Sequence, residues 1–256
     1  LTLPAHSFYW FRLSRDVEVP AWHEEHLLGD DLPLLVLFDG WTSLFRDRVV
    51  PWRIRMAEKT REQLEREVLP RYVPQQRWFA GKGRALDSIA LRDWVVVERA
   101  GRSWLLALVD AVAAAHDAPA AAPASYFLPM SLVWGDVDEP QVRALGPAIL
   151  AKVRQQAQIG VIADSIVDEA FCRELVHAIG RRERLELAHG AISFEPAAAY
   201  ARIVDVDVDS LELQRGEGLS SNAVALLGEK LFVKAYRRLQ KGVNPEVEVG
   251  RYLDDV

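Results

Sequence analysis

Residues 210–254 hold the pattern that most restricts the fold of this chain. Three strand-like segments follow one another, a glycine-containing turn separates each from the next, and a helix comes last. The segments are Ser210–Arg215, Ala223–Leu227 and Leu231–Tyr236, and the helix is Pro245–Leu253. Strands this short are stable only when they pair, so we expect a small antiparallel sheet with the helix beside it.

The same segment carries residues suited to binding phosphate. The loop of residues 216–222 contains two glycines, which let backbone amides approach an anion, and Ser220, Ser221 and Asn222 add neutral hydrogen-bond donors. Lys234 on the third strand can neutralise phosphates if a carboxylate fixes its side chain, and Glu246 and Glu248 on the helix are the candidates. This is the order of a kinase N-terminal lobe.

Each of these features also has an ordinary interpretation. Glycine–serine loops are common in hairpins, lysines are common on strand surfaces, and glutamates favour the start of a helix because of its dipole. The loop also departs from the protein-kinase pattern G-x-G-x-x-G-x-V, since Asn222 replaces the last glycine. The argument for a phosphate site therefore rests on the order of all three features.

The N-terminal half predicts a helix packed on an antiparallel sheet. The helix is Arg55–Leu69, which we expect Pro70 to end. Ala111–Ala124 is rich in alanine and proline and predicts a connector. Strands are expected at Leu32–Phe38 (alternatively a helical turn), Ser88–Val97, Ser103–Val109 and Tyr126–Trp134, with a turn at Ala100-Gly101 joining the second and third.

A second region begins near Gly146. Helices are predicted at Pro147–Gln158 and Val167–Ile179, and a strand with a turn at Ala191–Ala199. The charged run Arg181–Glu186 predicts a solvated face. Asp205, Asp207 and Asp209 alternate with valines, which indicates the acidic face of a strand rather than a metal site.

Composition excludes several classes of function. The chain has 256 residues and a net charge of −6, which is ordinary for a globular protein and favours neither nucleic acid nor an anionic membrane as partner. It has no apolar run long enough for a membrane helix and no signal segment at Leu1, so we expect a cytoplasmic protein. Cys172 is the only cysteine, which excludes an intrachain disulfide and a cysteine-based zinc site; its apolar surroundings predict a buried, inert thiol.

Two other motifs do not hold up as sites. In QQRWFAGKG, residues 75–83, Lys82 is followed by glycine and lacks the glycine spacing of a phosphate-binding P-loop. His23-Glu24-Glu25-His26 places its histidines three apart rather than four, with no third ligand near, which indicates a charged loop rather than a zinc site.

The phosphate-site segment resembles a known family. Residues 214–254 are similar to the nucleotide-binding lobe of bacterial maltokinases: a Ser/Asn loop, a strand that ends in the nucleotide lysine followed by Tyr-Arg-Arg, then Asn-Pro and a glutamate-bearing helix, as in VKAYRRLQKGVNPEVE. QQRWFAGKG, preceded by Leu69-Pro70, resembles the same family's N-terminal cap domain. LPAHSFYWFRL, at residues 3–13, resembles the last strand of the β-domain that closes trehalose synthases, which occur fused to maltokinases.

The resemblance implies an α+β fold in five parts. These are the last strand of a trehalose synthase β-domain at 1–13, a linker at 14–31, a cystatin-like cap domain (helix on antiparallel sheet) at 32–145, an intermediate subdomain at 146–209, and at 210–256 the start of a truncated kinase-like lobe, similar to that of aminoglycoside phosphotransferases. In such a cap domain Trp78 and Phe79 are core anchors, and Gly81-Lys82-Gly83 is a turn.

The implied reaction is transfer of a phosphoryl group from ATP to maltose, giving maltose 1-phosphate. Lys234 takes the phosphate role, and Glu248 is its expected partner because it fits the family's Asn-Pro-x-x-Glu spacing; Ser220, Ser221 and Asn222 line the loop. The base and the Mg²⁺ ligands of the family lie in a C-terminal lobe, and their H-x-D-x-x-x-x-N pattern is absent here. We therefore expect no catalytic residue and no metal ligand in this chain, and no activity from it alone.

Two rival hypotheses belong to other classes. The chain could be an accessory or docking module of a trehalose synthase with a degenerate kinase lobe, although the intact Lys234 and Asn-Pro-x-x-Glu pattern argues against decay. It could also be the tail of a protein that is chiefly a maltose–trehalose isomerase, which only residues 1–13 support.

Overall fold

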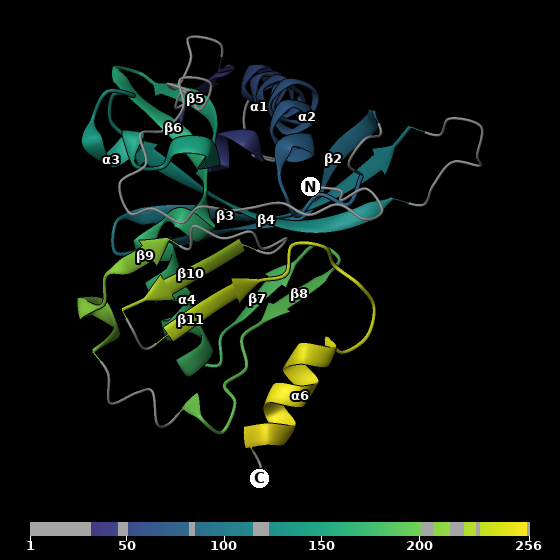
Figure 1. Cartoon of the computed structure of the whole chain (residues 1–256). Coiled ribbons are helices and arrows are strands. Elements are labelled where there is room, and N and C mark those ends of the chain that lie inside the picture. The colour runs from purple at the N-terminus through teal and green to yellow at the C-terminus, as the bar shows by residue number, and fades with distance from the viewer. Residues whose placement is uncertain are drawn as a thin grey trace, which may run out of the picture.

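The computed structural model describes residues 32–45, 51–81, 85–114, 123–200, 207–215, 223–228 and 231–254. It shows a mixed α/β chain in which a large sheet lies beside a smaller one (Figure 1). Several predictions fall outside the described residues: the strand at 1–13, the linker at 14–31 with its His23–His26 motif, Lys82, most of the alanine-rich connector, and the loop with Ser220, Ser221 and Asn222.

A six-stranded sheet forms the N-terminal part, which we call the large sheet. Its strand order is β1-β5-β6-β4-β3-β2, with β1 parallel to β5 and all other neighbours antiparallel. The strands are β1 Leu34–Leu37, β2 Leu86–Arg99, β3 Arg102–Ala113, β4 Ala124–Trp134, β5 Ile149–Gln155 and β6 Gln158–Asp164. Short helices at Thr42–Leu44, Pro140–Arg143 (α3) and Gly146–Ala148 connect them.

The predicted β2–β3 hairpin is confirmed. Its two turn residues both adopt positive φ, 47° at Ala100 and 75° at Gly101, which suits the right-handed twist of the flanking strands. The strands at Leu34–Leu37 and Ala124–Trp134 are confirmed as well.

The predicted stop at Pro70 is wrong. Helix α1, Pro51–Gln63, continues through a π-helical turn at Leu64–Val68 into α2, Leu69–Tyr72, and a 3₁₀ turn follows at Val73–Gln75. In the π turn the N–H of Leu69 bonds to the carbonyl of Leu64, five residues back. A proline ring clashes with the carbonyl four residues earlier, and a widened turn just before Pro70 relieves that clash without ending the helix.

The helix predicted at Pro147–Gln158 is also wrong. This segment forms β5 and the start of β6, joined by a turn in which Gln156 has a φ of 54°. Ile149, Leu150 and Ala151 are buried in succession, so the first half of β5 lacks the alternation of apolar and polar residues that distinguishes a strand from a helix. The domain boundary expected at 145/146 therefore lies within the large sheet, which extends to Asp164.

The central strands of the large sheet are buried on both faces. Along β3, Leu105, Ala107 and Val109 face the core that α1, the π turn and α2 cover, and Trp104 and Leu106 face a second core on the other side. Phe79 is buried in the first core and Trp78 packs against it, as predicted. Both faces thus pack against helices.

Helix α4, Glu169–Gly180, covers the second face, close to the predicted bounds. Asp168 caps it: one carboxylate oxygen accepts the N–H of Ala170, and the other accepts the Trp104 indole N–H and the Ser131 hydroxyl, both at 2.8 Å. Phe171 enters the core of the large sheet, whereas Cys172 and Val176 enter the core of the smaller one. Helix α4 is therefore the layer between the two sheets (Figure 1).

The smaller sheet has strand order β11-β10-β9, all antiparallel, as the sequence predicts. Its strands are β9 Leu213–Arg215, β10 Ala223–Leu227 and β11 Leu231–Ala235, and helix α6, Pro245–Asp254, follows. A separate hairpin joins β7, Arg184–Leu187, to β8, Gly190–Ser193. Residues 208–210 are a 3₁₀ helix rather than part of a strand, because the Asp207 carboxylate accepts the N–H of Asp209 and caps a helical turn.

Candidate functional site

Lys234 and helix α6 come together beside the smaller sheet. Asn244 and Pro245 start α6: the Asn244 side-chain oxygen accepts the N–H of Glu246 at 2.9 Å, and Pro245 occupies the first helical position. This places Glu246 in the first turn, where its carboxylate reaches back to β11. Its two oxygens lie 2.7 and 2.6 Å from the Lys234 Nζ.

Tyr236 completes this cluster. Its hydroxyl hydrogen-bonds to the Glu246 carboxylate, and the Lys234 Nζ lies 5.0 Å from the centre of its ring. The hydrogen bonds that Lys234 donates to Glu246, reinforced by Tyr236, raise the pKa of Lys234, and the Lys234 ammonium, followed by the Tyr236 hydroxyl, lowers the pKa of Glu246. The lysine is therefore a fixed cation at neutral pH.

The preference for Glu248 as the partner of Lys234 is wrong. Glu248 stands two residues after Glu246, a rotation of about 200° around the helix, so the two carboxylates point in different directions. Glu248 uses its backbone N–H to bond the Asn244 carbonyl at 3.0 Å, and its side chain is exposed. Whether Glu248 contacts a nucleotide stays a prediction.

The register of the smaller sheet places the start of β10 beside Lys234. Val224 pairs with Lys234 and Ala223 with Ala235, so β10 begins directly opposite the lysine. Residues 216–222, which lead into β10, lie outside the described residues, and the roles of Ser220, Ser221 and Asn222 stay predictions.

Arg237 is the residue that sequence reasoning missed. It directly follows Tyr236, and only 1% of its side chain is exposed. Its Nη2 lies 2.6 Å from each carboxylate oxygen of Asp164, at the end of β6. The Tyr-Arg-Arg motif marks the position, but only the three-dimensional contact shows that the first arginine is buried.

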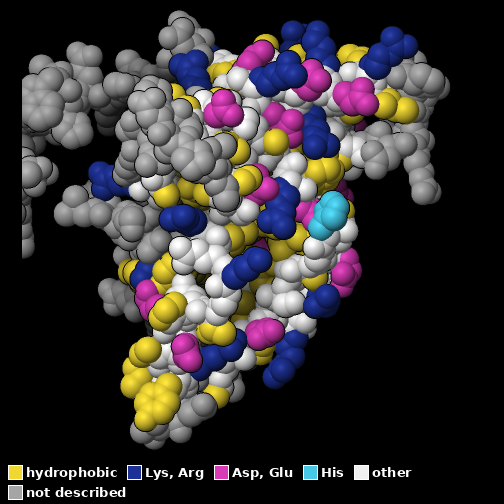
Figure 2. Space-filling view, turned by 90° about the vertical axis from the view of Figure 1, so that its right-hand side faces the viewer, with side chains coloured by type: hydrophobic (Ala, Val, Ile, Leu, Met, Phe, Trp, Pro, Cys, Tyr) yellow, Lys and Arg dark blue, Asp and Glu magenta, His cyan; other side chains and the backbone are white. Residues whose placement is uncertain are grey.

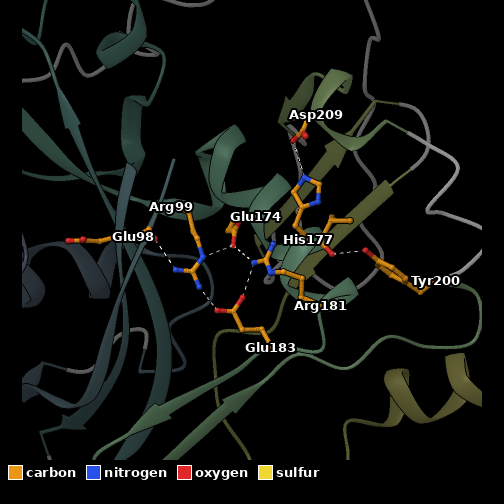
Figure 3. Close-up of polar contacts among 9 residues, drawn as sticks. Glu98, Arg99, Glu174, His177, Arg181, Glu183, Tyr200 and Asp209 are labelled. Atoms are coloured by element: carbon orange, nitrogen blue, oxygen red, sulfur yellow. Dashed lines mark hydrogen bonds and ion pairs between the residues drawn. The ribbon is translucent and has the colours of Figure 1, made fainter. Parts of the chain in front are cut away.

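A second charged cluster surrounds helix α4 (Figure 3). Arg99 and Arg181 each bind both Glu174 and Glu183, and His177, one turn after Glu174 on the helix, lies 3.0 Å from Asp209. The run Arg181–Glu186 is therefore partly an ion-pair network rather than only a solvated face. Two guanidiniums balance two carboxylates here, which is typical of a structural link between β2, α4 and the segment before β7.

A cavity of about 610 Å³ opens at the turn end of the large sheet. Two of its polar side chains have partners inside the protein: the Gln155 side-chain oxygen accepts the Gly40 N–H, and the Gln141 amide donates to Glu139. Within the described residues, no group of three or more His, Cys, Asp or Glu side chains is arranged to hold a metal ion. The Lys234 cluster is therefore the better candidate for a ligand-binding site.

The surface near α6 is apolar. Figure 2 shows hydrophobic side chains gathered at the end of the molecule where α6 lies, and the exposed large hydrophobic residues of that helix are Val247, Val249, Tyr252 and Leu253. None of the described helices has the length and apolar character needed to cross a membrane.

Comparison with known families adds one assignment. Residues 72–168 match the maltokinase N-terminal cap domain. The match runs from the end of α2 to the residue that caps α4, so it includes strands β2 to β6, which we now call the cap-like part of the large sheet. This part of the chain is maltokinase-like. A comparison with curated proteins found no match.

Proposed function

We propose that this chain is the N-terminal part of a maltokinase, which transfers the γ-phosphoryl group of ATP to maltose and forms maltose 1-phosphate. The observation that carries the proposal is the ion pair between Lys234 on β11 and Glu246 on α6. A lysine on a strand, oriented by a glutamate from the following helix, is how kinase-like lobes hold the phosphates of a nucleotide. The maltokinase-like cap next to this cluster supports the choice of substrate.

The described residues fit one part of such a nucleotide site. Lys234 is partly exposed, so its ammonium can reach an anion without leaving Glu246. A phosphate placed there meets a positive charge that is already oriented, which lowers the cost of binding. Bound ATP would supply the phosphoryl group, and Lys234 would hold its phosphates.

A Mg²⁺ ion, unlike the phosphates, has no candidate binding cluster among the described residues. The described residues offer no cluster of carboxylates that could hold it. We place the metal ligands and the base that accepts the sugar's proton in a further lobe that the sequence of this chain does not include. For the same reason we propose that the chain alone does not phosphorylate maltose.

The test is maltose-dependent ADP formation by the full-length protein, with Lys234→Ala against the matched control Lys241→Ala. Lys241 lies in the exposed connection before α6 and has the same charge. We expect Lys234→Ala to lower kcat/KM by about a hundredfold or more and Lys241→Ala to leave it unchanged. Wild-type protein that interconverts maltose and trehalose but forms no ADP would overturn the proposal in favour of an accessory module of a trehalose synthase.

A further inference from the structure

The connection between β11 and α6 is part of the large sheet. Strand β6 pairs with β4 only from Met130 to Trp134, which leaves the first half of β4 with a free edge. The connection fills that edge: the Phe127 N–H donates to the Arg237 carbonyl at 2.7 Å, and the Leu239 N–H donates to the Ser125 carbonyl at 2.8 Å. Residues 237–239 thus run antiparallel to β4, with Arg238 opposite Tyr126.

The buried side chain of Arg237 holds this connection against the large sheet. Besides its two bonds to Asp164, its Nη1 lies 3.4 Å from the Phe127 carbonyl, and its guanidinium carbon lies 5.7 Å from the centre of the Trp78 ring. Asp164 is itself fixed, because it accepts the Ile166 N–H at 3.1 Å and lies 3.4 Å from the Tyr72 hydroxyl. A buried arginine with a bidentate carboxylate has one geometry, so position 237 cannot shift relative to the large sheet without breaking both bonds.

Lys234 and Glu246 lie on opposite sides of this anchor. Lys234 comes three residues before Arg237, at the end of β11, and Glu246 lies in the first turn of α6 after the connection. Both partners of the ion pair are partly exposed, so the pair by itself contributes little to holding β11 and α6 together. The buried contact between the two partners along the chain is the attachment of residues 237–239 to β4 and Asp164.

We propose that Arg237 is a positioning residue: by bonding to Asp164 it makes the cap-like part of the large sheet set the distance between Lys234 and Glu246. The cap-like part of the large sheet then determines the geometry of the Lys234 cluster and is not an independent domain. The consequence for phosphoryl transfer rests on the proposed function, whereas the mechanical coupling does not.

The first experiment tests the coupling without any nucleotide. Spin labels are attached to cysteines at Phe232 on β11 and Tyr252 on α6, whose side chains are 64% and 69% exposed. Cys172 is buried and stays unlabelled. Pulsed electron resonance then gives the distance distribution between the two labels. We expect one narrow distribution in the labelled parent and in the control Arg238→Met, whose changed side chain is exposed, and a broad one in Arg237→Met.

A second variant tests the same coupling if Arg237→Met does not fold. Leu239→Pro removes the N–H that bonds to Ser125 while leaving the buried ion pair untouched. Broadening in either folded variant supports the proposal. An unchanged narrow distribution in the variants that fold overturns it.

The second experiment asks whether Arg237 acts through the ion pair. In the full-length protein, Arg237→Met is combined with Glu246→Gln, and kcat/KM for maltose phosphorylation is measured for both single variants and the double variant. We expect Arg237→Met to lower kcat/KM about tenfold alone and to have no further effect once Glu246 is changed, because the two residues act as a unit. Additive losses would overturn the positioning role. Broadened distances in a protein without kinase activity would instead leave the coupling standing and overturn the proposed function.

Discussion

Asp164 and Arg237 are 73 residues apart in the chain and form a bidentate ion pair in the protein interior, with both nitrogen–oxygen distances at 2.6 Å. The pair joins the last strand of the large sheet to the connection that leads into α6. Both side chains are almost fully buried, so this pair contributes both to stability and to the geometry of the Lys234 cluster.

Removing one partner of this pair should destabilise the protein strongly. We expect Asp164→Asn to lower the free energy of unfolding by about 3–5 kcal/mol, because the Arg237 charge stays buried without a counter-charge. The double variant Asp164→Leu/Arg237→Met should lose less than the single one, since neither charge then remains. Urea unfolding followed by tryptophan fluorescence gives both values, and a double variant less stable than Asp164→Asn would contradict the explanation.

Glu246 and Glu248 should differ in their effect on activity. If the proposed function holds, Glu246→Gln lowers kcat/KM for maltose phosphorylation by about 10- to 100-fold, because Lys234 loses the carboxylate that orients it. Glu248→Gln, on the same helix with the same change of charge, should stay within about twofold of wild type. Equal losses in both variants would show that α6 reorients when nucleotide binds.

The sequence alone predicts the smaller sheet and α6 well. Gly228, with a φ of 57°, directly follows β10, and Asn244-Pro245 is a standard helix start, so local chemistry favours these elements. The choice between Glu246 and Glu248 depends on how α6 is rotated against β11. The rotation of α6 depends on contacts outside the helix, including the anchor at Arg237. The spacing of residues in a sequence motif gives no information about it.

The failures at Pro70 and at residues 147–158 have a related cause. The π turn that accommodates Pro70 is stabilised by the packing of Leu64, Val68 and Leu69 in the core of the large sheet. No local sequence pattern predicts this turn. Residues 149–155 lie between β1 and β6, and the first three are buried in succession, so pairing with the neighbouring strands decides their conformation. Burial of Arg237 likewise depends on a carboxylate 73 residues away.

Asp93 should make stability depend on pH in the acid range. Its side chain is buried, which alone would raise its pKa, but the backbone N–H groups of His189, Ala188 and Trp94 and the nearby His189 ring outweigh burial and lower the pKa below the ordinary 3.8. A carboxyl whose pKa is lower in the folded state contributes stability that is fully present above its unfolded pKa. That contribution is lost as the pH falls through the folded pKa.

The variant Asp93→Asn tests this assignment. An amide NH₂ would face one of the donating N–H groups, so we expect the free energy of unfolding to fall by about 1–3 kcal/mol at pH 7. The difference from wild type should stay constant down to about pH 4 and shrink below it. Asp87→Asn, on an exposed position of the same strand, is the control. A difference between Asp93→Asn and wild type that grows as the pH falls would contradict the lowered pKa.

Gly160 should tolerate no side chain. A Cβ at this position of β6 would lie 2.4 Å from the Val133 carbonyl oxygen and 3.0 Å from the Trp134 Cα, both backbone atoms of the paired strand β4. Gly160→Ala should therefore cost about 2–3 kcal/mol of unfolding free energy. Gly250 in α6 has open space around it, so Gly250→Ala should add up to about 1 kcal/mol through helix propensity. Thermal unfolding of the two variants should shift in opposite directions.

Cys172 should be unreactive in the native protein and reactive once the chain unfolds. Its side chain is buried between α4 and the smaller sheet, and burial, together with the negative charges of Asp168 and Asp164, raises the pKa of its thiol to about 12. At pH 8 the thiolate is then on the order of one part in ten thousand, and the reagent has no access to it. We expect no reaction with a disulfide reagent such as Ellman's over an hour in buffer, and one reactive thiol per chain in concentrated urea.

Because reaction of Cys172 requires opening of the α4 layer, the slow labelling rate in intermediate urea should follow the unfolding rate measured by fluorescence. Full labelling within minutes in buffer would show that α4 separates from the smaller sheet without global unfolding, and would contradict the packing on which the placement of Lys234 depends.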